Sequence, residues 1–294
     1  MSNATNHKLV KKIIAESFSS KKLSSYALCL NIGIKDLQIT VINEQTSACV
    51  LLLDYRLENI KTVKGRVEII ESIIGGHKML SSDLWNSIKV SFKSHKFSLV
   101  PNSHFIPETS SDYLALNCKI KTKIDEVYYY KHISSSAVNI FASDKLIVNF
   151  LKNTYNNKSL QVVHQGSALI EGVLKYDDHA QDKTMFSFVD RGILHIIVSA
   201  NRKLLYYNQF STHKSEEMLK YIMLVFKELK MSSKTSPLVI WGMVKTNSEL
   251  VELTKKYIKN LSLGAKPNFL KFSKEFDSVE DHRYFDAYSI FLCE

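Results

Sequence analysis

The chain has 294 residues, of which 45% are hydrophobic and 23% charged, and its mean hydropathy is -0.10. This balance is typical of a folded protein, and the length suits one large domain or two lobes with separate cores. No stretch approaches the roughly 18 uncharged apolar residues of a spanning helix, and residues 1–8 lack the apolar centre of a secretory signal. We expect two lobes, no membrane insertion and a cytoplasmic location.

The formal net charge is +10. Clustered Lys and Arg would favour nucleic acid or an anionic membrane, because they neutralise phosphates. The charge here is mostly lysine and is dispersed, with local concentrations at residues 8–12, 21–22 and 119–123. A solvated lysine-rich surface is therefore the preferred interpretation.

The four cysteines are Cys29, Cys49, Cys118 and Cys293. They are scattered along the chain without a Cys-x-x-Cys pair, and several lie in apolar runs. This pattern predicts reduced packing residues, with neither disulfides nor zinc.

The first half of the chain alternates extended and helical patterns. β-branched residues and short polar breaks predict an antiparallel meander, and later segments predict further strands and helices. We expect strands at 26–32, 37–42, 48–55, 87–92, 97–101, 137–142 and 160–164, with helices at 63–80, near Tyr113, at 145–155 with Asp144 as N-cap, and at 167–174.

After a polar stretch the same pattern begins again. Residues 176–183 have no apolar periodicity and are the predicted connection between lobes. Beyond them we expect strands at 185–190, 194–199, 204–210 and 238–241, helices at 215–230 and 247–260, and two last extended runs at 268–272 and 288–292. The predicted organisation is an N-terminal extension at 1–22, a first lobe at 23–175 and a second lobe at 184–294.

A short hairpin motif stands at the head of each lobe. It reads Asn31-Ile-Gly33 in the first lobe and Asp190-Arg-Gly192 in the second, about 160 residues later. Each motif follows a predicted first strand and precedes a second. A duplicated step of this kind is more informative than either motif alone.

The order of these features resembles the actin, hexokinase and Hsp70 superfamily, and more closely its catalytically reduced members, the cytoplasmic scaffolds of bacterial pilus and type II secretion machines. The chain is also similar to the uncharacterised bacterial family called domain of unknown function 3822. The features that carry the likeness, which extends over about residues 23–292, are the two meanders, the segments 97–101 and 138–142 and the turn at 164–167. The resemblance implies two RNase H-like lobes with mixed five-stranded sheets and a duplicated βββαβαβα pattern.

In active members of that superfamily, paired Asp-x-Gly hairpins hold nucleotide phosphates and magnesium, since glycine amides approach phosphate and carboxylates coordinate the hydrated metal. Carried onto this chain, the hairpin positions are Asn31 with Gly33 and Asp190 with Gly192; one carboxylate is replaced by an amide. The water-positioning candidates would be His164, Gln165 and Glu171, and the purine loop would be the turn at Gly242, followed by the bulky Met243.

Other enzyme signatures are absent from the sequence. There is no Walker loop, dinucleotide fingerprint, nucleophile elbow or His-Glu-x-x-His motif. His164 and Ser167 with Asp177 or Asp178 could be imagined as a hydrolase set, but a satisfied histidine at a strand end is the simpler interpretation. Likewise, Ser215 is interpreted as a helix cap and residues 281–283 as a surface loop.

The run at 128–132 combines aromatic residues with positive charge, as in platforms that bind single-stranded nucleic acid, although an ordinary strand or protein interface has the same composition. We expect a non-enzymatic actin-like scaffold or interaction protein with a protein partner, a degenerate nucleotide cleft and no cofactor. Two alternatives stay open: a switch that binds ATP and magnesium without efficient hydrolysis, and a basic nucleic-acid-associated protein. If the cleft is active, the chain is a nucleoside triphosphatase.

Overall fold

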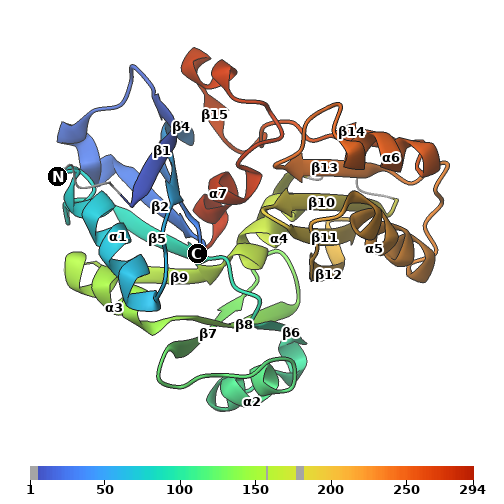
Figure 1. The fold of residues 1–294 in the computed structure, drawn as a ribbon, viewed down its shortest axis with the longest axis horizontal. Helices are drawn as coiled ribbons and strands as arrows, with labels where there is room; N and C mark the ends of the chain where they lie inside the picture. The colour runs from blue at the N-terminus through green and yellow to red at the C-terminus, as the bar shows by residue number, and fades with distance from the viewer. Residues whose placement is uncertain (1–5, 157, 177–181) are drawn as a thin grey trace. The chain divides into compact units, whose positions relative to one another are not determined.

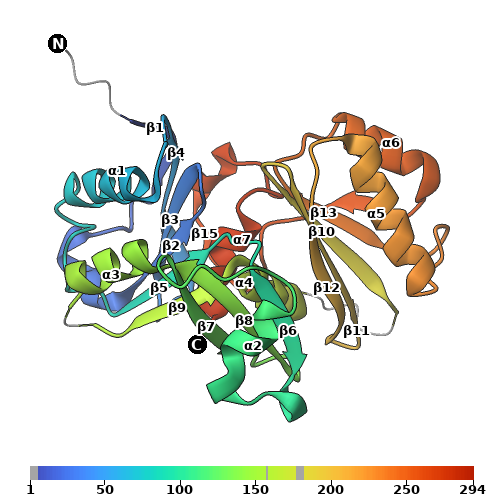
Figure 2. The same ribbon diagram turned by 60° about the horizontal axis from the view of Figure 1, so that its bottom comes forward.

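The computed structural model describes residues 6–156, 158–176 and 182–294 (Figures 1 and 2). The chain divides into two compact units. Unit 1 comprises Met1–Ala168, Leu270–Phe276 and Ala287–Glu294, and unit 2 comprises Leu169–Phe269 and Asp277–Asp286. Each unit contains a mixed sheet, so the α/β fold class predicted from the sequence is confirmed.

The sheet of unit 1 has seven strands. Its order is β1–β4–β3–β2–β5–β9, and β15 also pairs with β4. The pairs from β1 to β2 are antiparallel and those from β2 to β9 are parallel. The bounds are β1 His7–Ile14, β2 Tyr26–Ile32, β3 Asp36–Asn43, β4 Ala48–Leu57, β5 Ser87–Phe92, β9 Leu160–His164 and β15 Lys271–Phe272. The predicted five strands thus form the centre, and β1 and β15 extend it.

The central strands β2 and β3 are almost fully buried, so both faces of the sheet are covered there. Helix α1 (Val63–Gly75) packs beside α3 (Lys145–Thr154) on one face (Figure 2). Thr62 caps α1 at the Gly65 amide, and Asp144 caps α3 as predicted. Helix α1 ends before the predicted residue 80, at the Gly75-Gly76 pair.

A small three-stranded sheet completes the main part of unit 1. Its order is β6–β8–β7, and helix α2 packs against it. The bounds are β6 Phe97–Pro101, β7 Asp125–Lys131, β8 Ala137–Asp144 and α2 Ser110–Ala115, with 3-10 turns at Ser20–Ser25, Asn102–His104 and Pro107–Thr109. Val100, Leu114, Val138 and Ile140 form its core.

The sheet of unit 2 has five strands, as predicted, in the order β12–β11–β10–β13–β14. Helices α5 and α6 pack together on one face of it (Figure 2). The bounds are β10 Thr184–Asp190, β11 Ile193–Ala200, β12 Lys203–Ser211, β13 Leu238–Gly242, β14 Leu261–Leu263, α5 Ser215–Glu228 and α6 Glu249–Tyr257. Strands β10, β13 and β14 run parallel to one another.

The observed units differ from the predicted lobes at the N-terminus, at the connection and near the C-terminus, where Leu270–Phe276 and Ala287–Glu294 of the predicted second lobe belong to unit 1. Strand β1 pairs with β4, so part of the predicted 1–22 extension belongs to the first sheet. The division falls after Ala168, inside helix α4 (Gln165–Tyr176), because the start of this helix follows β9 directly. Residues 177–181 of the predicted connection lie outside the described residues.

The C-terminal run at 288–292 is not the predicted strand. It forms the end of α7 (Phe285–Ser289) and the 3-10 turn Ile290–Leu292, after another 3-10 turn at Lys274–Ser278. A short apolar run does not reveal by itself whether it is strand or helix. Here the residues pack on a face of the first sheet, where Lys89 Nζ donates to the Phe291 carbonyl at 2.7 Å.

Candidate functional site

In unit 1, the residues singled out in the sequence meet at the carboxyl ends of parallel strands. Ile32 of β2 pairs with Phe92 of β5, which pairs with His164 of β9. Asn31, Gly33 and Gln165 are therefore held at the same edge of one sheet, with β5 between them. The carboxyl edge of parallel strands is where open α/β sheets bind ligands.

Asn31 is fully buried, and its side chain is directed to a neighbouring strand. Its Nδ2 donates to Gln38 Oε1 at 3.0 Å, and the two residues face each other in the β2–β3 ladder. Both groups are neutral amides. The position where the resemblance places a metal-binding carboxylate is thus part of a buried amide pair.

Gly33 is crowded by a carboxylate. The Gly33 amide donates to the Asp36 carbonyl at 2.9 Å, and a Cβ at Gly33 would lie 2.2 Å from Asp36 Oδ1. The Asp36 side chain is buried and forms an ion pair with Lys93 Nζ at 2.5 Å. The space beside the glycine is therefore already filled by the Asp36–Lys93 ion pair.

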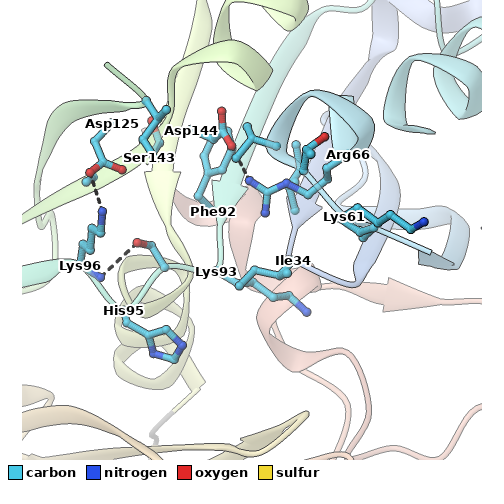
Figure 3. Close-up of a pocket in the computed structure, with 17 residues that line it drawn as sticks. Ile34, Lys61, Arg66, Phe92, Lys93, His95, Lys96, Asp125, Ser143 and Asp144 are labelled. Atoms are coloured by element: carbon cyan, nitrogen blue, oxygen red, sulfur yellow. Dashed lines mark hydrogen bonds and ion pairs between the residues drawn. The ribbon is translucent and has the colours of Figure 1, made fainter. Parts of the chain in front are cut away.

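A pocket of about 480 Å³ adjoins this hairpin (Figure 3). Apolar side chains from several elements form much of its lining: Ile32, Ile34, Ile60, Phe92, Ile124 and Ala142. Charged groups stand around them: Lys61, Arg66, Lys93, Lys96, Asp125 and Asp144. The combination of an apolar surface with a few polar groups is typical of a binding pocket.

Two ion pairs cross the lining of this pocket. Arg66 Nη2 lies 2.5 Å from Asp144 Oδ2, and Lys96 Nζ lies 2.5 Å from Asp125 Oδ2 (Figure 3). The Asp144 carboxylate also caps α3, accepting from the Leu146 amide at 3.0 Å. The start of α1, at Val63, and the start of α3, at Asp144, both line the pocket.

His164 is buried in a polar cluster of unit 1. Its Nε2 lies 2.8 Å from the Ser94 carbonyl, and its Nδ1 accepts from the Gly166 amide at 3.0 Å. Asn139 Nδ2 donates to Ser167 Oγ at 2.9 Å. Burial lowers the pKa of His164 to about 4, so the neutral ring is retained at neutral pH. This is the satisfied histidine at a strand end, and Asp177 and Asp178 of the imagined hydrolase set lie outside the described residues.

In unit 2, the second hairpin and the predicted purine loop meet at one edge of the sheet. Val189 pairs with Gly242 at the carboxyl ends of β10 and β13. Arg191 and Gly192 form the turn with φ angles of 47° and 84°, as a tight two-residue hairpin requires. Asp190 is buried, and its Oδ1 accepts from Arg191 Nη1 at 3.0 Å.

The glycines of unit 2 are close to other protein groups. A Cβ on Gly192 would lie 2.1 Å from His213 Cε1, so the imidazole covers the turn. The Gly242 amide donates to the His282 carbonyl at 2.8 Å, and the next amide, of Met243, donates to the Val189 carbonyl at 2.7 Å. The amides of the predicted purine loop are thus used inside the protein.

A second pocket, of about 420 Å³, lies beside these turns. Its lining includes Arg191, Gly192, His213, Met243 and Ser248. Glu171 of α4 is also buried in unit 2 and is not part of this lining. The structure therefore brings Gly192 and the Gly242 loop together in one pocket of this unit, without Glu171.

Of two predictions for loops of unit 2, the cap at Ser215 is wrong, and the loop at 281–283 is observed but contains one buried residue. Ser215 is the first residue of α5 instead of its cap, and its hydroxyl donates to Glu249 Oε2 at 2.9 Å because the preceding turn places Lys214 at the cap position. The segment 281–283 is not simply a surface loop: His282 is buried, and its Nε2 lies 2.8 Å from the Val244 carbonyl. Tertiary contacts hold both residues.

The tyrosines at 128–130 lie on β7 and alternate between its faces. Tyr128 stacks on Phe141, Tyr129 contacts Phe105 and is exposed, and Tyr130 is buried. A stacking platform for nucleic acid needs several aromatic rings on one exposed face. This arrangement favours the ordinary-strand interpretation.

The described part of the chain offers neither a metal-ligand cluster nor a membrane span. In residues 6–156, 158–176 and 182–294, no group of three or more His, Cys, Asp or Glu is placed to hold a metal ion. Within the same ranges, no helix has both the length and the apolar character needed to cross a bilayer.

Comparison with known proteins identifies the family. The family model described as "Protein of unknown function (DUF3822)" matches residues 15–261. The chain belongs to the DUF3822 family. A search of curated proteins gave no match.

Solved structures show the fold of this DUF3822 member. A protein of Bacteroides thetaiotaomicron VPI-5482 with an actin-like ATPase fold and unknown function is 18% identical, with a TM-score of 0.78 over 94% of this chain and 99% of that chain. The PilM-PilN type IV pilus biogenesis complex gives 12% identity and a TM-score of 0.53, over 90% of this chain and 97% of that chain. This DUF3822 protein thus has the actin-like ATPase fold predicted from the sequence.

The sequence did not reveal the polar residues of the unit 1 pocket. Arg66 and Asp144 are 78 positions apart, and Lys93 and Asp36 are 57 apart. No local motif marks such pairs. The predicted N-cap at Asp144 was a signal for this place, because the N-terminus of a helix favours the binding of anions.

Proposed function

We propose that this protein is a non-enzymatic scaffold or interaction protein built on the actin-like fold. One observation carries the proposal: protein groups take the positions through which related folds would hold phosphate and metal. Asp36 stands beside Gly33, His213 beside Gly192, and the Gly242 amide donates to His282. These contacts support a cleft whose hairpins do not hold ATP and magnesium.

The electrostatics of the first hairpin support this proposal. The buried Asp36 carboxylate occupies the space beside Gly33 and is paired with Lys93 Nζ at 2.5 Å, so a phosphate there would have to displace this ion pair. Asn31 supplies no negative charge to a magnesium ion because its side chain is a neutral amide, and Nδ2 of that amide already donates to Gln38. Phosphoryl transfer needs positioned metal and charge stabilisation together.

The likeness to PilM, known in a complex with PilN, supports a role in protein interaction. PilM shares only the fold with this chain at 12% identity. In the PilM-PilN complex the fold nevertheless takes part in an assembly of proteins. In this chain, the pocket beside the first hairpin offers a surface for a partner.

An ATPase assay and a thermal shift assay test the proposal. The purified protein should release no phosphate from ATP with magnesium, and millimolar ATP should leave its melting temperature unchanged, because a ligand that binds the folded state raises it. Asp190→Ala serves as the matched variant. A magnesium-dependent hydrolysis rate that Asp190→Ala abolishes would refute a non-enzymatic function.

A second candidate is an ATP-binding switch without efficient hydrolysis. The pocket of about 420 Å³ in unit 2 favours it, since this pocket is lined by Gly192 and Met243 of the two predicted nucleotide turns. This candidate predicts a rise in melting temperature with ATP and magnesium, without phosphate release. If ATP and magnesium raise the melting temperature of wild type but not of Gly192→Val, the ATP-binding switch replaces the first candidate.

A further inference from the structure

The pocket beside the first hairpin combines an apolar floor, a positive rim and two helix starts. We propose that it binds an acidic segment of a protein partner, with a carboxylate at the starts of α1 and α3 and an aliphatic side chain on the floor. The inference rests on the proposed interaction function and names the chemistry of the partner.

Two helix N-termini line this pocket. Helix α1 has 13 residues and α3 has 10, and neither has an acidic residue in its first turn. The backbone dipoles of a helix give its N-terminus a partial positive charge that stabilises an anion. Asp144, the α3 cap, is the acidic group at these two starts, and it is already paired with Arg66. A partner carboxylate would complement the second dipole.

An unpartnered hydroxyl supplies independent support. Ser143 of β8 lines the pocket next to Asp144, and the residue is only 3% exposed. Its Oγ has no hydrogen-bond partner among the described residues, and the same holds for Arg66 Nε. Buried donors without acceptors are unfavourable. A carboxylate entering here, with a small adjustment of Arg66, would accept from both.

The charge of the rim is also unbalanced. Lys93 and Lys96 are paired with Asp36 and Asp125, and Arg66 with Asp144. Lys61 is exposed and makes no ion pair with any described residue. One positive charge at the rim thus has no partner in the described chain, which favours an acidic ligand.

The apolar part of the pocket indicates a segment rather than a small ion. Ile34 is 56% exposed at the rim, and Ile32 and Phe92 line the pocket beside it. An exposed isoleucine that continues an apolar pocket is typical of a protein contact. An aliphatic side chain beside the acidic residue would cover this surface.

Selection from a random peptide library displayed on phage, against the purified full chain, tests the inference. Enriched peptides should share acidic residues next to an aliphatic one. Synthetic peptides of that consensus are then measured by fluorescence anisotropy with wild type, Lys61→Glu and Ile34→Asp. Each substitution should weaken binding about tenfold or more, the effect of losing one favourable charged or apolar contact.

Lys64→Glu is the matched control. Lys64 carries the same charge three positions along, is exposed and does not line the pocket. Its reversal should weaken binding much less than that of Lys61. Three outcomes would each overturn the inference. The first is an equal effect of the Lys61 and Lys64 reversals, and the second is an enriched consensus without acidic residues. The third is full displacement of the peptide by free glutamate together with no effect of Ile34→Asp. The last of these would indicate a small organic anion instead.

The result separates this inference from the proposed function. A chain that lacks ATPase activity but selects no acidic peptide would retain the scaffold proposal and remove the pocket assignment. A chain that hydrolyses ATP and still binds such peptides through Lys61 would remove the non-enzymatic proposal and retain the pocket assignment.

Discussion

Replacing Gly242 by Ala tests whether this glycine serves packing or ligand binding. Gly242 ends β13 with a φ of 104°, which side chains rarely adopt. A Cβ there would lie 2.1 Å from the Val189 carbonyl oxygen and 2.7 Å from the Val189 nitrogen. Both are backbone atoms of the neighbouring strand, so no rotamer change relieves the contact.

The expected loss of stability has two parts. An unfavourable backbone conformation costs about 1–3 kcal/mol, and overpacking against a rigid neighbour costs about 1–3 kcal/mol more. The free energy of unfolding should therefore fall by roughly 2–6 kcal/mol. For a chain of this size, that predicts a decrease in melting temperature of about 4–24 °C, using about 2–4 °C per kcal/mol.

Differential scanning calorimetry without nucleotide measures this effect, with Gly75→Ala as control. Gly75 is the last residue of α1, and a Cβ there would meet nothing within 4 Å. Its replacement should raise stability by up to about 1 kcal/mol, because alanine favours helix over glycine. If Gly242→Ala melts like wild type, packing against Val189 does not require a glycine at this position, and the structural explanation for the single glycine of the loop is wrong.

Two further predictions concern buried ionisable groups. Because the unfolded chain protonates His164 near pH 6.5 and the folded chain only near 4, the free energy of unfolding should fall between these values as pH decreases, by about 1.4 kcal/mol per pH unit. Urea unfolding at several pH values gives the free energy of unfolding as a function of pH. This free energy should depend less steeply on pH in His164→Gln than in wild type. An identical pH dependence in the two proteins would contradict a neutral buried ring. Burial raises the pKa of Cys29 to about 12 and also raises that of Cys49. Mass spectrometry after brief treatment with a thiol reagent should therefore show modification of the partly exposed Cys118 and not of Cys29 or Cys49, and rapid labelling of either buried thiol would show that the sheet opens.

Local sequence signals predicted most of the central strands and several helix starts. The meanders are rich in β-branched residues, and the motifs at 31–33 and 190–192 mark turns, so they were visible without tertiary information. The Asp144 cap was predicted for the same reason, since its bonds to Leu146 and Ile147 span only two and three residues.

Edge strands and the C-terminal segment were missed because their structure depends on distant partners. Strand β1 contains three of the lysines that were interpreted as a solvated surface, although lysine is also common on strands at sheet edges. The run at 288–292 is apolar enough for a strand, but its place on the face of the first sheet made it helical. Neither outcome follows from local propensity.

The sequence by itself determined the fold class, the duplicated hairpins and the replacement of one hairpin carboxylate by Asn31, because each depends on residue types in local order. Only the tertiary structure decided what surrounds those hairpins. His213 beside Gly192 and the pocket at the starts of α1 and α3 arise where segments separated in sequence pack together, and the Asp36 carboxylate beside Gly33 is held there by Lys93 of a different segment. Side-chain contacts of this kind depend on packing geometry, which a pattern of residue types does not contain.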